Sequence, residues 1–179
     1  MTTISASEKK ILDKICSQVP YSLLTEESRE LLFTDIEFVK YNVGQRLIRP
    51  DELPQNISLI LSGKIRLLAR SSRSNDPITL CLRGSGQLIG WSSLLRGKAC
   101  EWAIASEPTV AISIKSDIFL KVLKSSHDFQ NVFNNLSNPH ESFDVASKLL
   151  ENSPKDLKSW FNNLLLSLDD VHVFSMPAG

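Results

Sequence analysis

The sequence lacks a net charge, because its 20 Lys and Arg residues balance its 20 Asp and Glu residues. A neutral chain is not expected to coat DNA or anionic lipid by electrostatics alone, although a local basic patch is compatible with this balance. The sequence also lacks any apolar run near the roughly 20 residues that cross a bilayer. We therefore predict no nucleic-acid partner and no membrane insertion in this segment.

Cysteine is scarce, with Cys16, Cys81 and Cys100 far apart along the chain. An odd number of widely spaced cysteines argues against a disulfide framework. The first residues also lack the basic-then-apolar pattern of a secretory signal. We therefore expect a cytoplasmic location, with Cys81 as a small core residue in an alternating strand.

Catalytic and metal-binding motifs are missing as well. The three histidines, His127, His140 and His172, have no ligand-like spacing, so surface histidines and no bound metal are predicted. The glycines between Gly84 and Gly90 depart by one residue from a dinucleotide fingerprint, and Ala99 stands where a Walker A loop needs a hydroxyl for magnesium. No nucleophile–base pair stands out, so we predict that this segment is not an enzyme.

Helical spacing marks residues 1–35. Ser5 and Glu8 have the spacing of a capping box, and Pro20 would end the helix that follows. Thr25 precedes two acids and is expected to cap a second helix. The apolar positions of the first helix repeat at helical intervals: Ile11, Leu12, Ile15 and Val19.

Residues 36–116 change to the alternation that is typical of strands. Gly63 would join two of these strands with a positive φ angle. Many short strands with Gly or Pro turns between them indicate a β-sandwich, roll or barrel. The predicted strands lie near 36–43, 46–49, 57–61, 65–67, 78–82 and 110–114.

Residues 117–179 return to helical spacing, with Asp117 expected to cap the first helix. Further apolar stripes cover 129–136, 141–150 and 160–168, and residues 171–174 read as a strand. The stripe at 160–168 either packs on the strands or forms a partner surface. The predicted fold class is α+β, an antiparallel β-roll (a double-stranded β-helix, jelly-roll-like) flanked by N- and C-terminal helices.

Short motifs within residues 37–123 occur in a distinctive order: Tyr41–Gln45, Ile57–Ile65, Gly86–Gly90, Ala105 and Val110–Phe119. In this order and spacing the chain resembles the cyclic-nucleotide-binding domain family. The resemblance implies a β-roll in which the segment after Gly90 is a phosphate-binding cassette. In such a cassette a short helix points backbone N–H groups at the phosphate, an Arg adds charge, and a Glu binds the ribose hydroxyl.

Two positions depart from the family's cassette. Trp91 stands where the family places the ribose-binding Glu, and Ala99 where it places the phosphate-binding Arg. Each missing charge-assisted hydrogen bond is worth on the order of 1.5–3 kcal/mol, so a cyclic nucleotide is disfavoured and no other cofactor is predicted. The candidate ligand-binding residues are Gly90, Trp91, Ser92, Ser93, Arg96, Lys98, Ala99 and Trp102.

Alternatives remain open at this cassette. Arg96 or Lys98 could supply the missing charge. Trp91 and Trp102 could instead fill the vacated pocket, stack on a different planar ligand, or pack the roll. These alternatives predict different ligands, and the sequence does not decide among them.

The segment Gly90–Gly97, with Cys100 and Glu101 after it, resembles the variant cassette of domains fused ahead of bacterial peptidase-containing ABC exporters. This resemblance implies a regulatory or docking module at the cytosolic N-terminus of a longer transporter, whose partners are other domains of its own chain and an unknown small ligand. The rival hypotheses are a true cyclic nucleotide sensor and the sensory half of a transcription regulator that lacks its DNA-binding domain. Under each of them we expect the chain to be one piece of a longer protein.

Overall fold

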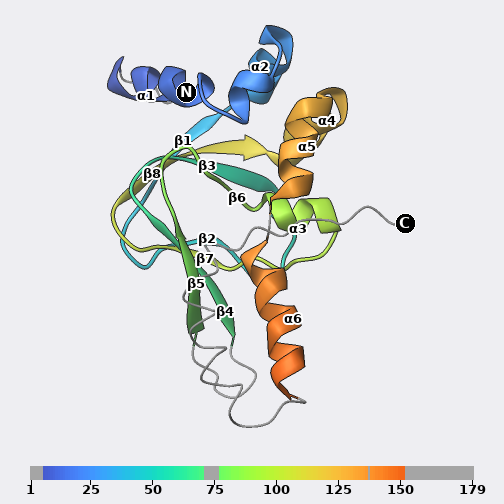
Figure 1. Cartoon of the computed structure of the whole chain (residues 1–179). Coiled ribbons are helices and arrows are strands. Elements are labelled where there is room, and N and C mark those ends of the chain that lie inside the picture. Colours follow the sequence, from blue (N-terminus) through green and yellow to red (C-terminus); the bar gives the residue numbers. More distant parts are fainter. Residues whose placement is uncertain (1–5, 71–76, 137, 152–179) are drawn as a thin grey trace, which may run out of the picture.

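The computed structural model describes residues 6–70, 77–136 and 138–151 (Figure 1). In this part of the chain, strands form two four-stranded sheets, with the orders β1-β8-β3-β6 and β2-β7-β4-β5. Every strand pair is antiparallel. The predicted α+β class, an antiparallel roll flanked by helices, is confirmed.

The elements follow one another in a simple order along the chain. The helices are α1 (Ala6–Cys16), the 3-10 turn η1 (Tyr21–Leu23), α2 (Glu26–Leu32), α3 (Trp91–Arg96), α4 (Ser116–Ser125), α5 (His127–Asn135) and α6 (Pro139–Glu151). The strands are β1 (Glu37–Tyr41), β2 (Arg46–Ile48), β3 (Asn56–Ser62), β4 (Ile65–Arg70), β5 (Pro77–Arg83), β6 (Leu88–Ile89), β7 (Ala103–Ala105) and β8 (Thr109–Lys115). Among these described helices, none is long and apolar enough to cross a membrane.

Two apolar cores lie on opposite faces of the first sheet. Ile57 and Leu59 of β3 pack with the helices, against a cluster that includes Phe119 and Phe129. Ile60 packs on the other face, in the core between the two sheets. Successive residues of a strand point to opposite faces, so β3 is buried on both sides. Figure 1 shows the same layering, with α1, α2, α4 and α5 over the first sheet and α6 beside the second.

Gly63 marks the point where the chain passes from one sheet to the other. Its φ is +90°, and a Cβ at this position would lie 2.5 Å from the Pro108 carbonyl oxygen and 2.5 Å from Thr109 Oγ1. The predicted positive φ is confirmed, and close approach is a second reason for glycine. The strands on either side do not pair with each other, because β3 pairs with β6 and β8 while β4 pairs with β5 and β7.

Two helix caps test the sequence predictions. Thr25 caps α2 as expected, because its Oγ1 accepts a hydrogen bond from the Ser28 N–H at 3.2 Å. The predicted cap at Asp117 is wrong, since α4 begins at Ser116 and has no side-chain cap. The Ser116 hydroxyl donates to the Pro54 carbonyl at 2.7 Å, so the loop before β3 anchors this helix start. Asp117 lies in the first turn, exposed to solvent.

Other differences come from short or exposed segments. Val19 is 65% exposed rather than buried, because α1 ends at Cys16 and the chain turns before Pro20. Strands β6 and β7, of two and three residues, were not predicted from the sequence. Cys81 is buried in β5, as expected. The predicted stripe at 160–168 and the predicted strand at 171–174 lie outside the described residues.

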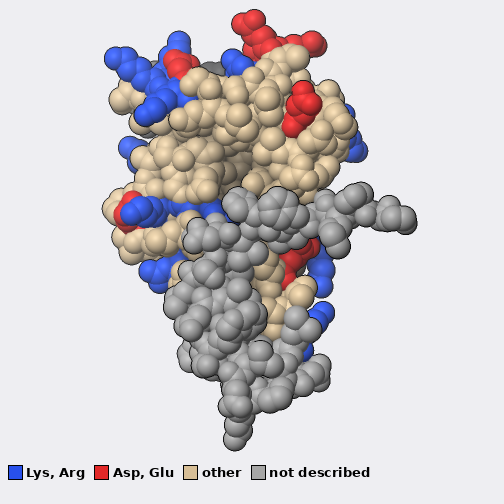
Figure 2. Space-filling view, viewed as in Figure 1, with Lys and Arg blue, Asp and Glu red and all other residues tan. Residues whose placement is uncertain are grey.

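The charges on the molecule are dispersed. In Figure 2, basic and acidic side chains lie mainly along the edges of the described surface, and a broad uncharged area covers the layer that contains the helices over the first sheet. The described part of this face therefore offers no extended patch of a single sign. Such dispersal agrees with the balance of 20 basic and 20 acidic residues.

Candidate functional site

The cassette predicted from the sequence is built around α3. Gly90 precedes this helix with a φ of +95°, and Gly97 follows it with a φ of +61°. A Cβ at Gly90 would lie 3.1 Å from Ile48 Cδ1 and 3.5 Å from Pro54 Cγ. Both the left-handed backbone and the close packing on β2 and the loop after it therefore favour glycine at position 90.

The N-terminus of α3 is occupied by a carboxylate of the chain itself. Glu101 Oε1 accepts a hydrogen bond from the Gly90 N–H, and Glu101 Oε2 accepts one from the Ser93 N–H, both at 3.2 Å. These N–H groups belong to the start of the helix, where backbone donors have no intrahelical partner. Glu101 is only 3% exposed. Its carboxylate thus satisfies donors that an anionic ligand would need.

Ser93 holds the Glu101 segment against the helix. The Ser93 Oγ accepts hydrogen bonds from the backbone N–H groups of Cys100 and Glu101, at 3.1 and 3.2 Å. The Ser93 N–H in turn donates to Glu101, so the two residues exchange side-chain-to-backbone hydrogen bonds in the manner of a capping box. Ser92 and Ser93 are both buried. This reciprocal pair positions the carboxylate.

The two tryptophans of the predicted site pack on different elements. The Trp91 ring lies 5.1 Å from the Phe133 ring of α5 in an edge-to-face arrangement. Trp102 approaches α6 instead, with its backbone N–H 3.4 Å from His140 Nε2, and the Arg70 guanidinium lies 5.9 Å from its ring centre. Both side chains are half-buried.

The two basic residues of the predicted site, Arg96 and Lys98, are both exposed. Arg96 is exposed in the last turn of α3 and forms an ion pair with Glu141 of α6. Lys98 is exposed and Ala99 is half-buried. Of the predicted site residues, the structure therefore brings Gly90 and Ser93 to one carboxylate, and Ser92 is buried next to them in the chain.

His140 corrects the expectation of a surface histidine, because it is 5% exposed. Its Nε2 lies 2.9 Å from the Leu68 carbonyl oxygen, a geometry in which Nε2–H donates. Within the described residues, neither His140 Nδ1 nor Trp102 Nε1 has a hydrogen-bond partner. The imidazole therefore joins the start of α6 to β4 through one of its two nitrogens.

The surroundings of His140 favour its neutral form. Burial lowers the pKa of the imidazole, and the nearby Arg83 guanidinium acts in the same direction. The Leu68 carbonyl and the carboxylates of Glu101 and Asp144 oppose this shift. The balance leaves the pKa below its ordinary value of 6.5. A proton on the second nitrogen would also lack an acceptor among the described residues.

Glu101 and His140 are the residues of this region that sequence reasoning missed as buried polar groups. For Glu101, the only sequence signal is a weak one: an acidic residue shortly before an apolar strand. Nothing in the spacing of α6 marks which face of that helix is covered, so the second had no signal. Among the described residues, no group of three or more His, Cys, Asp and Glu side chains could hold a metal ion.

Comparisons with known proteins agree with this architecture. Residues 38–126 match the sequence model of the cyclic nucleotide-binding domain family. The chain therefore contains a domain of that family, and the resemblance inferred from the motifs is confirmed at this level. No curated protein matches the chain in sequence.

Solved structures share the fold at low identity. A regulatory subunit of a cAMP-independent protein kinase A from Trypanosoma cruzi, bound to guanosine, is 14% identical with a TM-score of 0.65, over 80% of this chain and 53% of that one. The Trypanosoma brucei counterpart, a triple mutant bound to cAMP, is 16% identical with a TM-score of 0.64, over 78% and 53%. This chain thus spans about half the length of these trypanosomal chains. The sensor domain of the transcriptional regulator DNR from Pseudomonas aeruginosa is 13% identical with a TM-score of 0.58, over 68% and 86%.

Proposed function

We propose that this domain is a non-catalytic regulatory module whose cassette takes no cyclic nucleotide, because Glu101 occupies the position of the ligand's anion. The observation that carries the proposal is the buried carboxylate bonded to the Gly90 and Ser93 N–H groups. A cyclic phosphate would have to displace this carboxylate or lie against it.

The energetic penalty of either outcome is large. Displacement breaks two charge-assisted hydrogen bonds worth on the order of 1.5–3 kcal/mol each, and juxtaposed like charges cost several kcal/mol. Ala99 offers no guanidinium to offset this penalty. Since about 1.4 kcal/mol is a tenfold change, affinity for a cyclic nucleotide should be lower by several powers of ten than in an open cassette.

The trypanosomal structures support the proposal. The Trypanosoma brucei subunit belongs to a kinase described as cAMP-independent, and the cAMP-bound form is a mutant in which a glutamate, a threonine and a valine are replaced by alanine, arginine and alanine. The arginine gained in that mutant parallels the arginine that this chain lacks at Ala99. The Trypanosoma cruzi subunit is bound to guanosine, a ligand without a phosphate.

The test is a calorimetric titration with cAMP and cGMP. The wild type and the Arg96→Ala and Lys98→Ala variants should show no binding below about 1 mM, which corresponds to about 4 kcal/mol. The double variant Ala99→Arg with Glu101→Ala should bind in the micromolar range, and Ala99→Arg alone should not. Micromolar binding by the wild type that disappears in Arg96→Ala would instead establish a cyclic nucleotide sensor.

We further propose that the module belongs to the cytosolic N-terminal part of a bacterial ABC exporter and contacts other domains of the same chain. The support is the resemblance of Gly90–Gly97, Cys100 and Glu101 to the variant cassette of such proteins. The sequence encoded downstream in the gene tests this context. Transmembrane segments followed by a Walker A motif are expected, whereas a helix-turn-helix would show a transcription regulator.

A further inference from the structure

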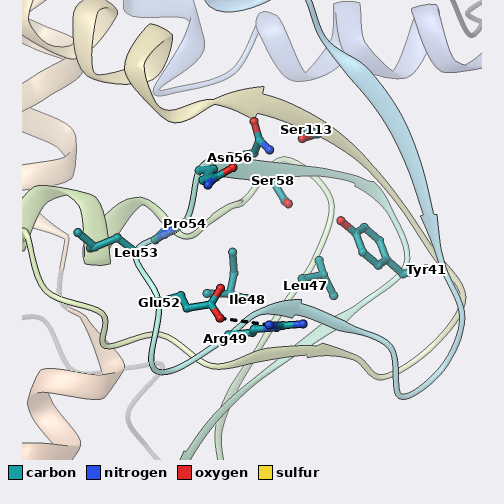
Figure 3. Close-up of a pocket in the computed structure, with 11 residues that line it drawn as sticks. Tyr41, Leu47, Ile48, Arg49, Glu52, Leu53, Pro54, Asn56, Ser58 and Ser113 are labelled. Atoms are coloured by element: carbon teal, nitrogen blue, oxygen red, sulfur yellow. Dashed lines mark hydrogen bonds and ion pairs between the residues drawn. The ribbon is translucent and has the colours of Figure 1, made fainter.

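A cavity of about 320 Å³ lies on the flank of the roll, between β2 and the first sheet (Figure 3). Its walls come from β1, β2, β3 and β8 and from the loop that joins β2 to β3. No residue of the predicted cassette lines it. This flank cavity is therefore separate from the position that Glu101 occupies.

One wall of the flank cavity is polar where the same face of the sheet is otherwise apolar. Ile60 of β3 packs in the core between the sheets, and alternation places Ser58 and Asn56 on that same face. Ser58 is paired in register with Ser113 of β8, so two hydroxyl side chains lie next to each other on adjacent strands. Ser58 is only 5% exposed. Polar residues at such inward positions are expected mainly where a site requires them.

Tyr41 adds a third hydroxyl to this wall, pointing from β1 toward Ser58 (Figure 3). Burial raises the pKa of the phenol, and a hydrogen bond with Ser58 partly opposes that shift. The phenol is therefore a neutral donor and acceptor at physiological pH. The polar wall as a whole offers uncharged hydroxyl and amide groups.

The opposite wall is apolar and the mouth has no net charge. Leu47, Ile48 and Pro54 face the hydroxyls across the cavity. At the mouth, Arg49 Nη1 lies 3.1 Å from Glu52 Oε1, and both side chains are more than half exposed. Because these two charges neutralise each other, nothing in the lining selects for an ion. A ligand with hydroxyls along one edge and an apolar ring face matches both walls.

We propose that the flank cavity binds a small, uncharged, hydroxylated ring compound, of the size of a nucleoside or a monosaccharide. The cavity volume lies at the lower end of the range for small-molecule pockets, about 300–1,000 Å³. This proposal does not depend on the role of Glu101.

The flank cavity also touches the residues that hold two helices. Ile48 and Pro54 pack on Gly90, which begins the turn into α3. The Pro54 carbonyl accepts the Ser116 hydroxyl at the start of α4. A ligand in contact with Ile48 and Pro54 would therefore contact residues that themselves contact the starts of α3 and α4.

The experiment is an NMR titration of the purified chain, in which backbone amide shifts are followed with guanosine in one arm and with glucose in the other. Saturable shifts at Asn56, Ser58 and Ser113 are expected in at least one arm, which also distinguishes a nucleoside from a sugar. Tyr41→Phe and Ser113→Ala should each weaken binding about five- to tenfold, because each removes one hydrogen bond to the ligand. Ser62→Ala, which removes an exposed hydroxyl from β3, the strand of Ser58, should leave binding unchanged.

The outcomes that overturn the proposal are specific. They are the absence of saturable shifts in both arms, shifts confined to α3 and Trp102, or binding that Tyr41→Phe and Ser113→Ala do not change. The cAMP and cGMP titrations of the Ala99 and Glu101 variants test the cassette, and this titration tests the flank cavity, so failure here is distinguishable from failure of the proposed function. An unchanged thermal midpoint of Tyr41→Phe, Ser113→Ala and Ser62→Ala shows that the fold of these variants is intact.

Discussion

Two polar contacts of the cassette region differ in how completely their polar groups are bonded: the one at the N-terminus of α3 and the one between Trp102 and α6. At its N-terminus, both oxygens of Glu101 accept hydrogen bonds, and Ser93 accepts two more. At the contact with α6, the His140 imidazole bonds through one of its two nitrogens, and Trp102 Nε1 has no partner among the described residues. A fully bonded polar network is rigid, whereas a partly bonded one is the cheaper place to open. The contact at the N-terminus of α3 is thus the more rigid of the two, and the α6 contact is the one that opens more easily.

The largest expected effect on stability is at the N-terminus of α3. Glu101→Ala leaves two N–H groups without an acceptor, at about 1–3 kcal/mol each, so the free energy of unfolding should fall by about 2–6 kcal/mol. Urea denaturation measures this loss. Glu107→Ala, which removes an acid from a less buried loop position, should change stability by less than about 0.5 kcal/mol. Equal effects of the two substitutions would show that Glu101 contributes no more to stability than an ordinary surface acid does.

The next effect concerns pH at the α6 contact. The pKa of His140 is lowered in the folded protein, so the folded state binds this proton less readily than the unfolded state does. The resulting stability is complete above pH 6.5, the ordinary pKa, and is lost as the pH falls below it. The free energy of unfolding should therefore decrease more between pH 7.5 and pH 5.5 in the wild type than in His140→Gln. The difference should be up to about 1.4 kcal/mol per pH unit.

The matched control for that measurement is His127→Gln, since His127 is exposed at the start of α5. Its pH dependence should follow that of the wild type. If His140→Gln also follows the wild type, the α6 contact does not respond to protons, and the two contacts do not differ in this respect.

The smallest effect is expected at the ion pair between Arg96 and Glu141. Both side chains reach solvent, and pairs of this kind contribute about 0–1 kcal/mol. A double-mutant cycle with Arg96→Ala and Glu141→Ala should give a coupling energy within that range. A coupling above about 2 kcal/mol would show that α6 is held by charge rather than by its buried residues.

Much of the fold could be predicted from local pattern. The alternation of Ile57, Leu59 and Leu61 predicted β3, and Thr25 before two acids predicted the cap of α2. These signals are local, because strand period and helix capping depend on neighbours within a few residues. The error at Asp117 shows where such reasoning ends, since Ser116 is held by the Pro54 carbonyl, 62 residues away.

The site could be predicted only in outline. Motif order predicted the cassette at Gly90, and the resemblance implied that its Arg and its Glu are replaced. The role of Glu101 depends on a hydrogen bond across eight residues to Ser93, and that of His140 on a bond across 72 residues to Leu68. No periodic pattern in the sequence predicts hydrogen bonds of this kind. The flank cavity was missed for the same reason, because the register of Ser58 with Ser113 follows from sheet pairing.

The Glu101 carboxylate has a consequence for what the domain can report. A diffusible ligand fills its site in proportion to its concentration, whereas a side chain of the same polypeptide is present at its site at a constant effective concentration. On the proposed function, the occupancy of this cassette is therefore the same in a starved cell and in a well-fed one. This occupancy is fixed by the amino-acid sequence and does not vary with the concentration of a metabolite.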